Sequence, residues 1–236
     1  MQLSERLTKV ASMVTAGNRL ADVGTDHGYV PIYLYEKKIV PHAIAMDIRK
    51  GPLERAKLHI AEAGLQDKIE TRLSDGLSAL GPGEADSIVI AGMGGPLMIR
   101  ILSAHPEVTA SAKELILQPQ SEVEKVRAWL CEKNYEITEE HMVFEEGKYY
   151  PMFKAAGNPG YRKLSPLECQ FGRLEVLREP EILRSFLKKE VEAKQAILQM
   201  LIEEATEKSK NRAEEMKQLI VQMEEALSEL SKCLVD

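Results

Sequence analysis

Apolar residues in the first 156 positions fall into short blocks, and each block is followed by a longer stretch with helical periodicity. Short blocks rich in Val, Ile and Leu are typical of strands that are buried on both faces of a parallel sheet. Before the first block, apolar residues recur at helical spacing over Leu3–Val14 and predict a short helix laid across the sheet. The predicted strands are residues 19–24, 42–47, 69–73, 86–91 and 114–119.

The pattern changes after the fifth of these units. Two strand-like runs, Tyr135–Glu145 and Tyr149–Ala156, are joined only by Glu146-Gly-Lys148, which leaves no room for a helix and predicts an antiparallel hairpin. Five β–α units followed by such a hairpin describe an α/β fold, the seven-stranded sheet of Rossmann-like class I methyltransferases, in which the last strand is antiparallel.

The C-terminal part has a different composition. From Ser165 onward there is no strand signal, and apolar residues alternate steps of three and four, which is typical of a coiled-coil seam. We predict an antiparallel α-helical coiled-coil hairpin with the polar segment Glu207–Arg212 at its tip. We therefore expect two domains, residues 1–158 and 159–236. The two seams are Leu183, Leu187, Val191, Leu198, Leu201 and Ala205, and Met216, Ile220, Met223, Leu227, Leu230 and Leu234.

Composition narrows the class of protein. The 236 residues carry a net charge of −6, which argues weakly against a dedicated nucleic-acid coat but allows a local basic patch. No apolar run is long enough to span a bilayer, and the amphipathic N-terminus is not a secretory signal, so we expect no membrane contact and a cytoplasmic location. Cys131, Cys169 and Cys233 are odd in number and scattered, which predicts neither a disulfide framework nor a metal site.

The first predicted strand leads into an acidic glycine turn that contains Asp22, Gly24, Asp26 and Gly28. Its glycine spacing is neither the G-x-G-x-x-G of dinucleotide-binding turns nor a P-loop. Carboxylates in such a turn would repel a pyrophosphate and attract a cation. S-adenosylmethionine carries a sulfonium and an ammonium group and no phosphate, so the turn suits this cofactor.

Aspartates also follow the next two strands. Asp47 stands where related folds place an acid on ribose hydroxyls, and Asp75 follows the third strand. Each aspartate alone could be only a helix cap or a turn residue. Together with Asp26 they mark three strand ends that meet at one crevice, which favours a ligand site.

Other candidates carry weaker signals. His27 and Tyr29 either begin a helix or hold a substrate base, with Tyr29 stacking on it. The segment Gly92–Gly95 lacks the polar-Pro-Pro-aromatic motif with which many methyltransferases hold an exocyclic amine. The basic residues are either solvated or phosphate contacts, and the helical hairpin could instead be a dimerisation element. These basic candidates are Arg162, Lys163, Lys208, Lys210 and Arg212.

The chain resembles the bacterial TrmK family of tRNA (adenine-22-N1)-methyltransferases along its whole length. The motifs that carry the resemblance are Ala21-Asp-Val-Gly-Thr-Asp-His-Gly-Tyr-Val-Pro31, Ala45-Met-Asp-Ile-Arg-Lys-Gly-Pro52, Ser74-Asp-Gly-Leu77, Ile90-Ala-Gly-Met-Gly-Gly95, Leu117-Gln-Pro-Gln120 and Glu146-Gly-Lys-Tyr-Tyr150. The resemblance implies methyl transfer from S-adenosyl-L-methionine to N1 of an adenine in tRNA. It implies a cofactor site lined by Gly24, Asp26, Gly28, Asp47, Ile48, Asp75 and Gly76, to which we add Asp22, His27, Gly92 and Met93, with Gly94 and Gly95 facing the substrate.

The implied chemistry agrees with the residues. Adenine N1 has an in-plane lone pair and no proton to lose, so the attack needs no general base, and the product base is cationic. Asp26 is our first candidate for stabilising this charge, with His27 and Tyr29 as further candidate catalytic residues that hold the base.

Two alternatives stay open at this point. One is a methyltransferase that acts on a small molecule or a protein, with the helical hairpin as its dimer contact. The other is a non-catalytic RNA-binding module with a relic cofactor site. The sequence leaves the oligomeric state open, with a monomer slightly favoured.

Overall fold

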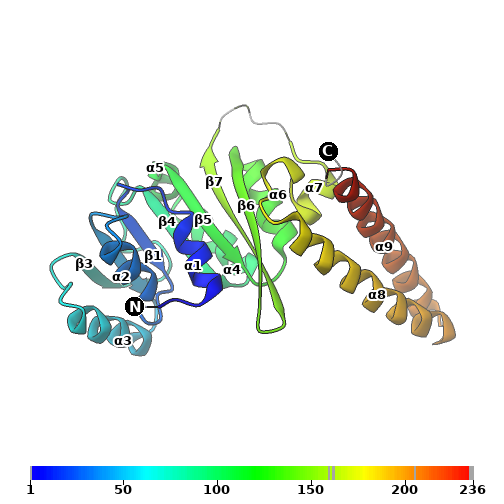
Figure 1. The fold of residues 1–236 in the computed structure, drawn as a ribbon, viewed down its shortest axis with the longest axis horizontal. Helices are drawn as coiled ribbons and strands as arrows, with labels where there is room; N and C mark the ends of the chain where they lie inside the picture. Colours follow the sequence, from blue (N-terminus) through cyan, green and yellow to red (C-terminus); the bar gives the residue numbers. More distant parts are fainter. Residues whose placement is uncertain (1, 159, 161–162, 205, 234–236) are drawn as a thin grey trace.

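A twisted seven-stranded sheet with helices on both faces forms the N-terminal part of the molecule (Figure 1). The computed structural model describes residues 2–158, 160, 163–204 and 206–233. The strands are β1 (Leu20–Val23), β2 (Ala43–Asp47), β3 (Ile69–Leu73), β4 (Ser87–Met93), β5 (Glu114–Pro119), β6 (Tyr135–Glu145) and β7 (Lys148–Gly157). The helices are α1 (Glu5–Ser12), α2 (Tyr29–Glu36), α3 (Lys50–Glu62), α4 (Gly95–Ala104), α5 (Pro106–Ser111), α6 (Val123–Glu132), α7 (Pro166–Phe171), the 3-10 helix η1 (Leu174–Val176), α8 (Pro180–Glu204) and α9 (Glu207–Cys233).

The strand order is β3-β2-β1-β4-β5-β7-β6. All pairs among β1 to β5 are parallel, and β7 is antiparallel to both of its neighbours, β5 and β6. This arrangement confirms the predicted seven-stranded sheet, whose last strand in the chain runs against the others.

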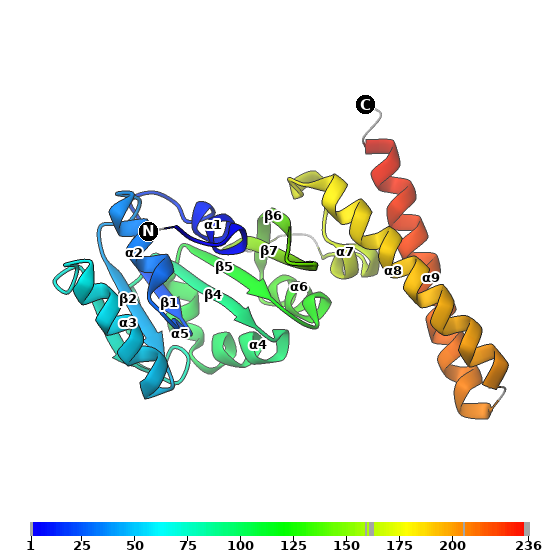
Figure 2. The ribbon, with the colours of Figure 1, turned by 60° about the horizontal axis from the view of Figure 1, so that its bottom comes forward.

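Alternation of side chains along the strands creates two apolar layers. Leu20 and Val89 face the layer that contains α1, α2 and α3, whereas Ala21 and Ile88 face the layer that contains α4, α5 and α6. Figure 2 shows α1 and α4 on opposite faces of β4 and β5. Both sheet faces are therefore covered, which leaves the ends of the strands as the places where a ligand can enter.

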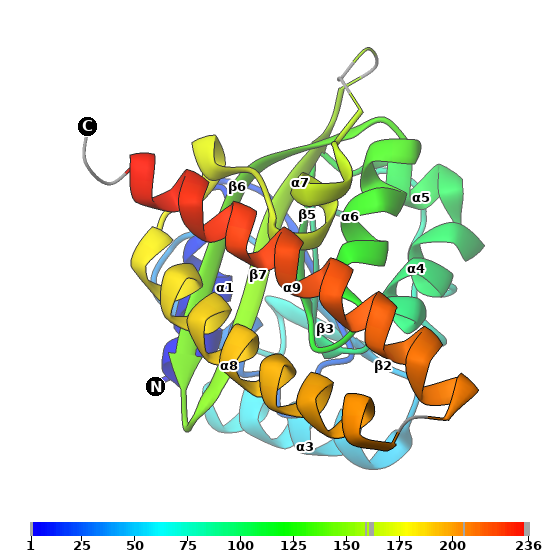
Figure 3. The same cartoon turned by 90° about the vertical axis from the view of Figure 1, so that its right-hand side faces the viewer.

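The helices α8 and α9 lie side by side and extend away from the β6–β7 edge of the sheet (Figures 1 and 3). A third apolar cluster joins Met142 of β6 to Leu183 and Leu187 of α8 and to Met223 of α9. Near this cluster, the buried Arg127 of α6 is paired with the buried Glu140 of β6. The guanidinium of Arg127 also donates to backbone carbonyls in α7. Packing and a buried ion pair thus fix the base of the helical pair.

The predicted tip of the hairpin was wrong in one respect. Because α8 ends at Glu204 and α9 begins at Glu207, the segment Glu207–Arg212 forms the first turns of α9 and is not the connection. Glu, Lys and Arg are good helix formers, and reciprocal hydrogen bonds between Thr206 and Ser209 begin the helix. The division into domains 1–158 and 159–236 stays a prediction.

Among the residues that the structure describes, no helix combines the length and the apolar character that crossing a membrane requires.

Candidate functional site

A cleft of about 630 Å³ opens at the carboxyl ends of β1 to β4. This is the end of a parallel sheet at which α/β proteins bind their ligands, and the volume lies in the usual range for a small-molecule site. The cleft brings together all the predicted cofactor-binding and catalytic residues: Asp22, Gly24, Asp26, His27, Gly28, Tyr29, Asp47, Ile48, Asp75, Gly76, Gly92 and Met93.

Two buried carboxylates lie side by side in the floor of the cleft. Asp22 belongs to β1 and Asp47 ends the neighbouring parallel strand β2. Burial, reinforced by the charge of Asp47, raises the pKa of Asp22 to about 6, although a hydrogen bond with Thr25 acts in the opposite direction. Asp47 accepts a hydrogen bond from the backbone N–H of Arg49 at 2.7 Å. A cationic or hydroxyl-bearing ligand would relieve this unfavourable concentration of negative charge.

The turn after β1 depends on two glycines for its backbone conformation. Gly24 has a φ of +80°, and the space that a Cβ would need is already filled by the end of the Met93 side chain. Gly28, with a φ of +69°, directly precedes the first residue of α2. Side chains at these positions would force the turn to change, so the turn depends on glycine.

Asp26 lies at the mouth of the cleft, with its side chain about half exposed, and it is not an isolated charge. It pairs with Arg55 of α3 and lies 3.5 Å from Nε2 of His27. The hydrogen bond with Arg55 is the largest cause that holds the pKa of Asp26 below its usual range. Asp26 is therefore ionised at neutral pH, and Arg55 already balances part of its charge.

His27 and Tyr29 form an aromatic group with His59 of α3. The ring centroids lie 4.9 to 5.4 Å apart, and the ring planes are within 22° of one another. The carbonyl of His27 is 2.9 Å from Nδ1 of His59, whereas Nδ1 of His27 is buried without a hydrogen-bond partner. The group presents flat surfaces beside the acidic turn, which suits contact with a planar base.

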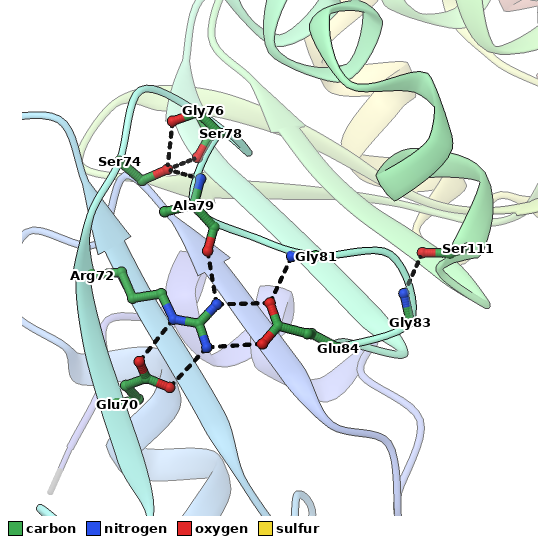
Figure 4. Close-up of polar contacts among 10 residues, drawn as sticks. All are labelled: Glu70, Arg72, Ser74, Gly76, Ser78, Ala79, Gly81, Gly83, Glu84 and Ser111. Atoms are coloured by element: carbon green, nitrogen blue, oxygen red, sulfur yellow. Dashed lines mark hydrogen bonds and ion pairs between the residues drawn. The ribbon is translucent and has the colours of Figure 1, made fainter.

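The loop that carries Asp75 and Gly76 is held by an ion-pair network (Figure 4). Arg72 of β3 donates to both oxygens of Glu70, to both oxygens of Glu84 and to the carbonyl of Ala79. The hydrogen bonds that Glu84 accepts from Arg72, with the one from the N–H of Gly81, lower the pKa of Glu84 to about 2. The hydroxyl of Ser74 donates to the carbonyl of Gly76 at 2.8 Å. Together these contacts set the position of this wall of the cleft.

Strand β4 continues two residues beyond its predicted end and contains a bulge at Gly92. The register with β5 shifts between Ala91 and Met93, and Gly92 has a φ of +77°. The N–H of Gly92 donates to the fully buried Gln118 at 3.0 Å, and the same oxygen accepts from Arg6 of α1 at 2.8 Å. The bulge directs the backbone at the β4 exit into the cleft.

Gly94 and Gly95 do not line the cleft. Gly94 precedes α4, and Gly95 lies against the backbone carbonyls of Ser121 and Glu122, where a Cβ would not fit. Of the basic candidates, Lys210 and Arg212 belong to the first turns of α9, at the end of the helical pair farthest from the sheet (Figure 1). Lys163 is exposed outside the cleft, Arg162 lies outside the described residues, and the side chain of Lys208 is likewise not described. The substrate-binding assignment of these residues stays a prediction.

The structure adds cleft residues that the sequence reasoning missed. Arg6, Arg49 and Arg100 place three guanidinium groups around an otherwise acidic site, and Gln120 follows β5 beside Gly92. Gln120 belongs to one of the motifs that carry the family resemblance, so the sequence contained a signal for it. Arg6 gave no local signal, because its place depends on how α1 crosses the sheet.

No group of three or more His, Cys, Asp or Glu side chains that could hold a metal ion occurs within the described part of the chain.

Comparison with known proteins gives consistent matches. The methyltransferase-domain family matches residues 3–153. The curated tRNA (adenine(22)-N(1))-methyltransferase of Bacillus subtilis (strain 168) is 39% identical over 155 residues, which is 66% of this chain and 65% of that relative. The chain thus spans slightly less than two thirds of that relative's length.

Two solved structures match over nearly their whole length. The B. subtilis M1A22 tRNA methyltransferase TrmK has 30% identity and a TM-score of 0.85, with 96% of this chain and 99% of that chain covered. The Streptococcus pneumoniae protein Sp1610, in complex with S-adenosyl-L-methionine, has 32% identity and a TM-score of 0.84, with 96% and 100% covered.

The fold and the acidic cleft at the strand ends define a Rossmann-like methyltransferase. With these matches, the chain belongs to the methyltransferase-domain family and, within it, to the TrmK family.

Proposed function

We propose that this protein transfers a methyl group from S-adenosyl-L-methionine to N1 of adenine 22 in tRNA, the reaction named for its Bacillus subtilis relative. The observation that carries the proposal is the cleft itself: buried carboxylates and a glycine turn lie at the strand ends, without a phosphate-binding glycine motif. Because tRNA is the proposed substrate, we also propose the cytoplasm as its location.

The residues of the cleft fit the cofactor. The buried Asp22, with its raised pKa, gains from a neighbouring cation, and the ammonium group of the methionine moiety is one. Asp47 offers carboxylate oxygens that can accept from both hydroxyls of a ribose. Ile48 and Leu97 expose apolar side chains in the same cleft, which suits the adenine ring. When bound, the cofactor supplies the electrophilic methyl group.

The chain's own contribution to the reaction is position and charge. The Gly92 bulge brings backbone and the Met93 side chain next to the glycine turn, so the β4 exit faces the place where a target base must lie. The N1 lone pair attacks without loss of a proton, and no side chain needs to act as a base. Asp26 carries a carboxylate at the mouth of the cleft and stabilises the positive charge that develops on the base.

His27 and Tyr29 are suited to hold that base. Their rings pack against His59, which favours a stacking surface that is in place before the substrate arrives. The target atom lies on the Watson–Crick edge of adenine, so the base must be unpaired or turned out when it enters the cleft.

The test is methyl transfer from labelled S-adenosyl-L-methionine to bulk bacterial tRNA, followed by nucleoside analysis. We expect 1-methyladenosine from the wild-type chain and none from Asp47→Ala, which removes a cofactor contact. If the wild-type chain binds the cofactor but labels no tRNA nucleoside, the substrate proposal fails, and a small-molecule or protein target takes its place.

A further inference from the structure

A second hollow continues from the cleft along the β6–β7 hairpin towards α8. It has a volume of about 470 Å³, and Gln120 lines both it and the cleft, so the two are adjacent. Its walls come from the tip of the hairpin, with Lys148, Tyr149 and Tyr150, and from α8, with Phe186 and Lys189. None of the groups assigned to the cofactor lies in it.

Tyr149, Tyr150 and Phe186 place aromatic rings in the wall of this hollow, and Phe144 lies next to it. Tyr149 of β7 lies opposite Phe144 of β6 in the hairpin, with ring centroids 4.5 Å apart, and contacts the edge of Phe186 at 5.2 Å. Its hydroxyl is 3.1 Å from the hydroxyl of Ser185. Phe144 keeps 46% of its surface exposed, which is unusual for so large an apolar ring. Tyr149, which is partly exposed, is thus held against α8, and Phe144 beside it is open to solvent.

Positive charge accompanies the rings. Lys189 lies over the Tyr149 ring at 5.8 Å from its centroid, and Arg6 of the cleft lies over the neighbouring Tyr150 at 5.4 Å. Neither Lys148 nor Lys189 has an ion-pair partner within the part of the chain that the structure describes.

Two of the nearby carboxylates are already engaged, and a third, Glu146 in the hairpin turn, is exposed. Glu190 pairs with Lys194 at 2.9 Å, and Glu145 accepts from the backbone N–H groups of Glu5 and Arg6 at the start of α1. The hollow thus carries two lysines without an ion-pair partner among the described residues, in a chain of net charge −6.

Accessible aromatic rings next to lysines are the combination with which proteins bind single-stranded or unstacked nucleic acid. Bases stack on the rings, and the ammonium groups contact the phosphates. We propose that Tyr149 and Phe144, together with Lys148 and Lys189, form a stacking platform for a tRNA nucleotide next to the adenine in the cleft. This inference rests on the proposed function, because it takes the adjacent cleft to hold that adenine.

The test measures binding of unmodified tRNA by fluorescence anisotropy, with cofactor affinity and kcat and KM for methyl transfer measured in parallel. Tyr149→Leu keeps apolar volume but removes the ring, whereas Tyr149→Phe keeps the ring. We expect Tyr149→Leu to raise the Kd and the KM for tRNA about tenfold, and Tyr149→Phe to stay within about twofold. Cofactor affinity and kcat at saturating tRNA should not change in either variant.

Lysine variants test the charges of the platform while its aromatic rings are kept. We expect Lys148→Ala/Lys189→Ala to raise the Kd for tRNA about tenfold and to lower the slope of log Kd against log salt by roughly one to two. The matched control is Lys37→Ala, because Lys37 lies over Tyr33 at the same 5.8 Å distance but at the end of α2 remote from the cleft. This control should bind tRNA like the wild-type chain.

The outcomes separate the two proposals. If the wild-type chain methylates tRNA but Tyr149→Leu and the double lysine variant bind it normally, the platform is refuted and the function stands. An equal loss in Lys37→Ala would also refute the platform, because the effect would then be one of overall charge. If the wild-type chain binds tRNA through these residues but methylates nothing, the proposed function fails alone. A wild-type chain that does not bind tRNA refutes both.

Discussion

The carboxylates of Asp22 and Asp47 are both buried at the ends of adjacent parallel strands, and they share one floor of the cleft. Burial is the main cause that raises the pKa of Asp22 to about 6, and the charge of Asp47 adds to it. The free protein therefore holds a carboxylate that would be more stable if it were neutral. Such a pair is costly to the fold and useful to a site that binds a cation.

The first prediction concerns stability without cofactor. Since the folded-state pKa of Asp22 lies above its ordinary value of 3.8, the folded protein binds more protons between about pH 4 and pH 6. The contribution of this group to the free energy of unfolding therefore falls as pH rises through that window, by about 3 kcal/mol in total. Asp22→Asn should unfold at higher denaturant concentration than the wild-type chain at pH 7, and the gain should shrink towards pH 4.

The quantity to follow is the difference in unfolding free energy between Asp22→Asn and the wild-type chain, from urea titrations at several pH values. Other carboxylates, such as Glu84, have lowered pKa values and act in the opposite direction, but they cancel in this difference. A gain that does not change with pH would show that the charge of Asp22 is not the cause. The same variant should bind S-adenosyl-L-methionine at least tenfold more weakly, because it loses the carboxylate that faces the cation.

The second prediction concerns the glycine turn. Gly24→Ala adds a methyl group where the end of Met93 lies, and it also places a side chain at a φ of +80°. Gly17→Ala is a matched control, because Gly17 has a φ of +89° but no atom within 4 Å of a Cβ. Both variants should lose about 1 to 3 kcal/mol of stability through backbone strain. Only Gly24→Ala should lose cofactor affinity in calorimetry, by more than tenfold, and equal affinities in the two variants would contradict this account.

The third prediction concerns the network in Figure 4. Arg72→Met keeps the aliphatic stem but removes every hydrogen bond to Glu70, Glu84 and Ala79. We expect faster amide hydrogen exchange over residues 74–84 and a cofactor Kd that is several-fold higher, because Asp75 and Gly76 are no longer held. Lys57→Met breaks an exposed ion pair with Glu54 and should change neither. Unchanged exchange in the Arg72 variant would mean that the loop is held by other contacts.

The fourth prediction concerns the buried amide of Gln118, which accepts from the N–H of Gly92 and from Arg6. Gln118→Leu leaves both donors without this acceptor, so the bulge at the β4 exit should lose its fixed position. We expect kcat for tRNA methylation to fall roughly tenfold, while cofactor affinity stays within about twofold. Gln118→Glu keeps an acceptor opposite Arg6 and should retain more of the activity. Full activity of Gln118→Leu would rule out this positioning role.

The strands could be predicted because the order of apolar and polar residues within a short segment is enough to indicate them. The predicted strands 69–73 and 114–119 became β3 and β5 with the same ends, and in β5 the apolar run is bounded by polar residues and proline. The short helices α5 and α7 were missed, since a helix of six residues shows too little periodicity to be recognised. The bulge at Gly92 was also missed, because the shift is defined only by its pairing with β5.

In the site, too, some residues could be predicted from the sequence and others could not. Asp26, Asp47 and Asp75 could be grouped from sequence because parallel strands end at one edge. The partners that set their chemistry could not be found this way. Arg55 is 29 residues from Asp26, and Arg6 is 112 residues from Gln118, so only the folded arrangement brings them together.

The most direct test of the central claim uses two tRNA transcripts that differ only at position 22, one with adenine and one with guanine. Each is incubated with the wild-type chain and S-adenosyl-L-methionine, and the methylated nucleotide is identified by mass spectrometry of nuclease fragments. We expect 1-methyladenosine at position 22 of the first transcript and no methylation of the second. Equal methylation of both transcripts, or a methyl group on the exocyclic nitrogen of adenine, would contradict the assignment.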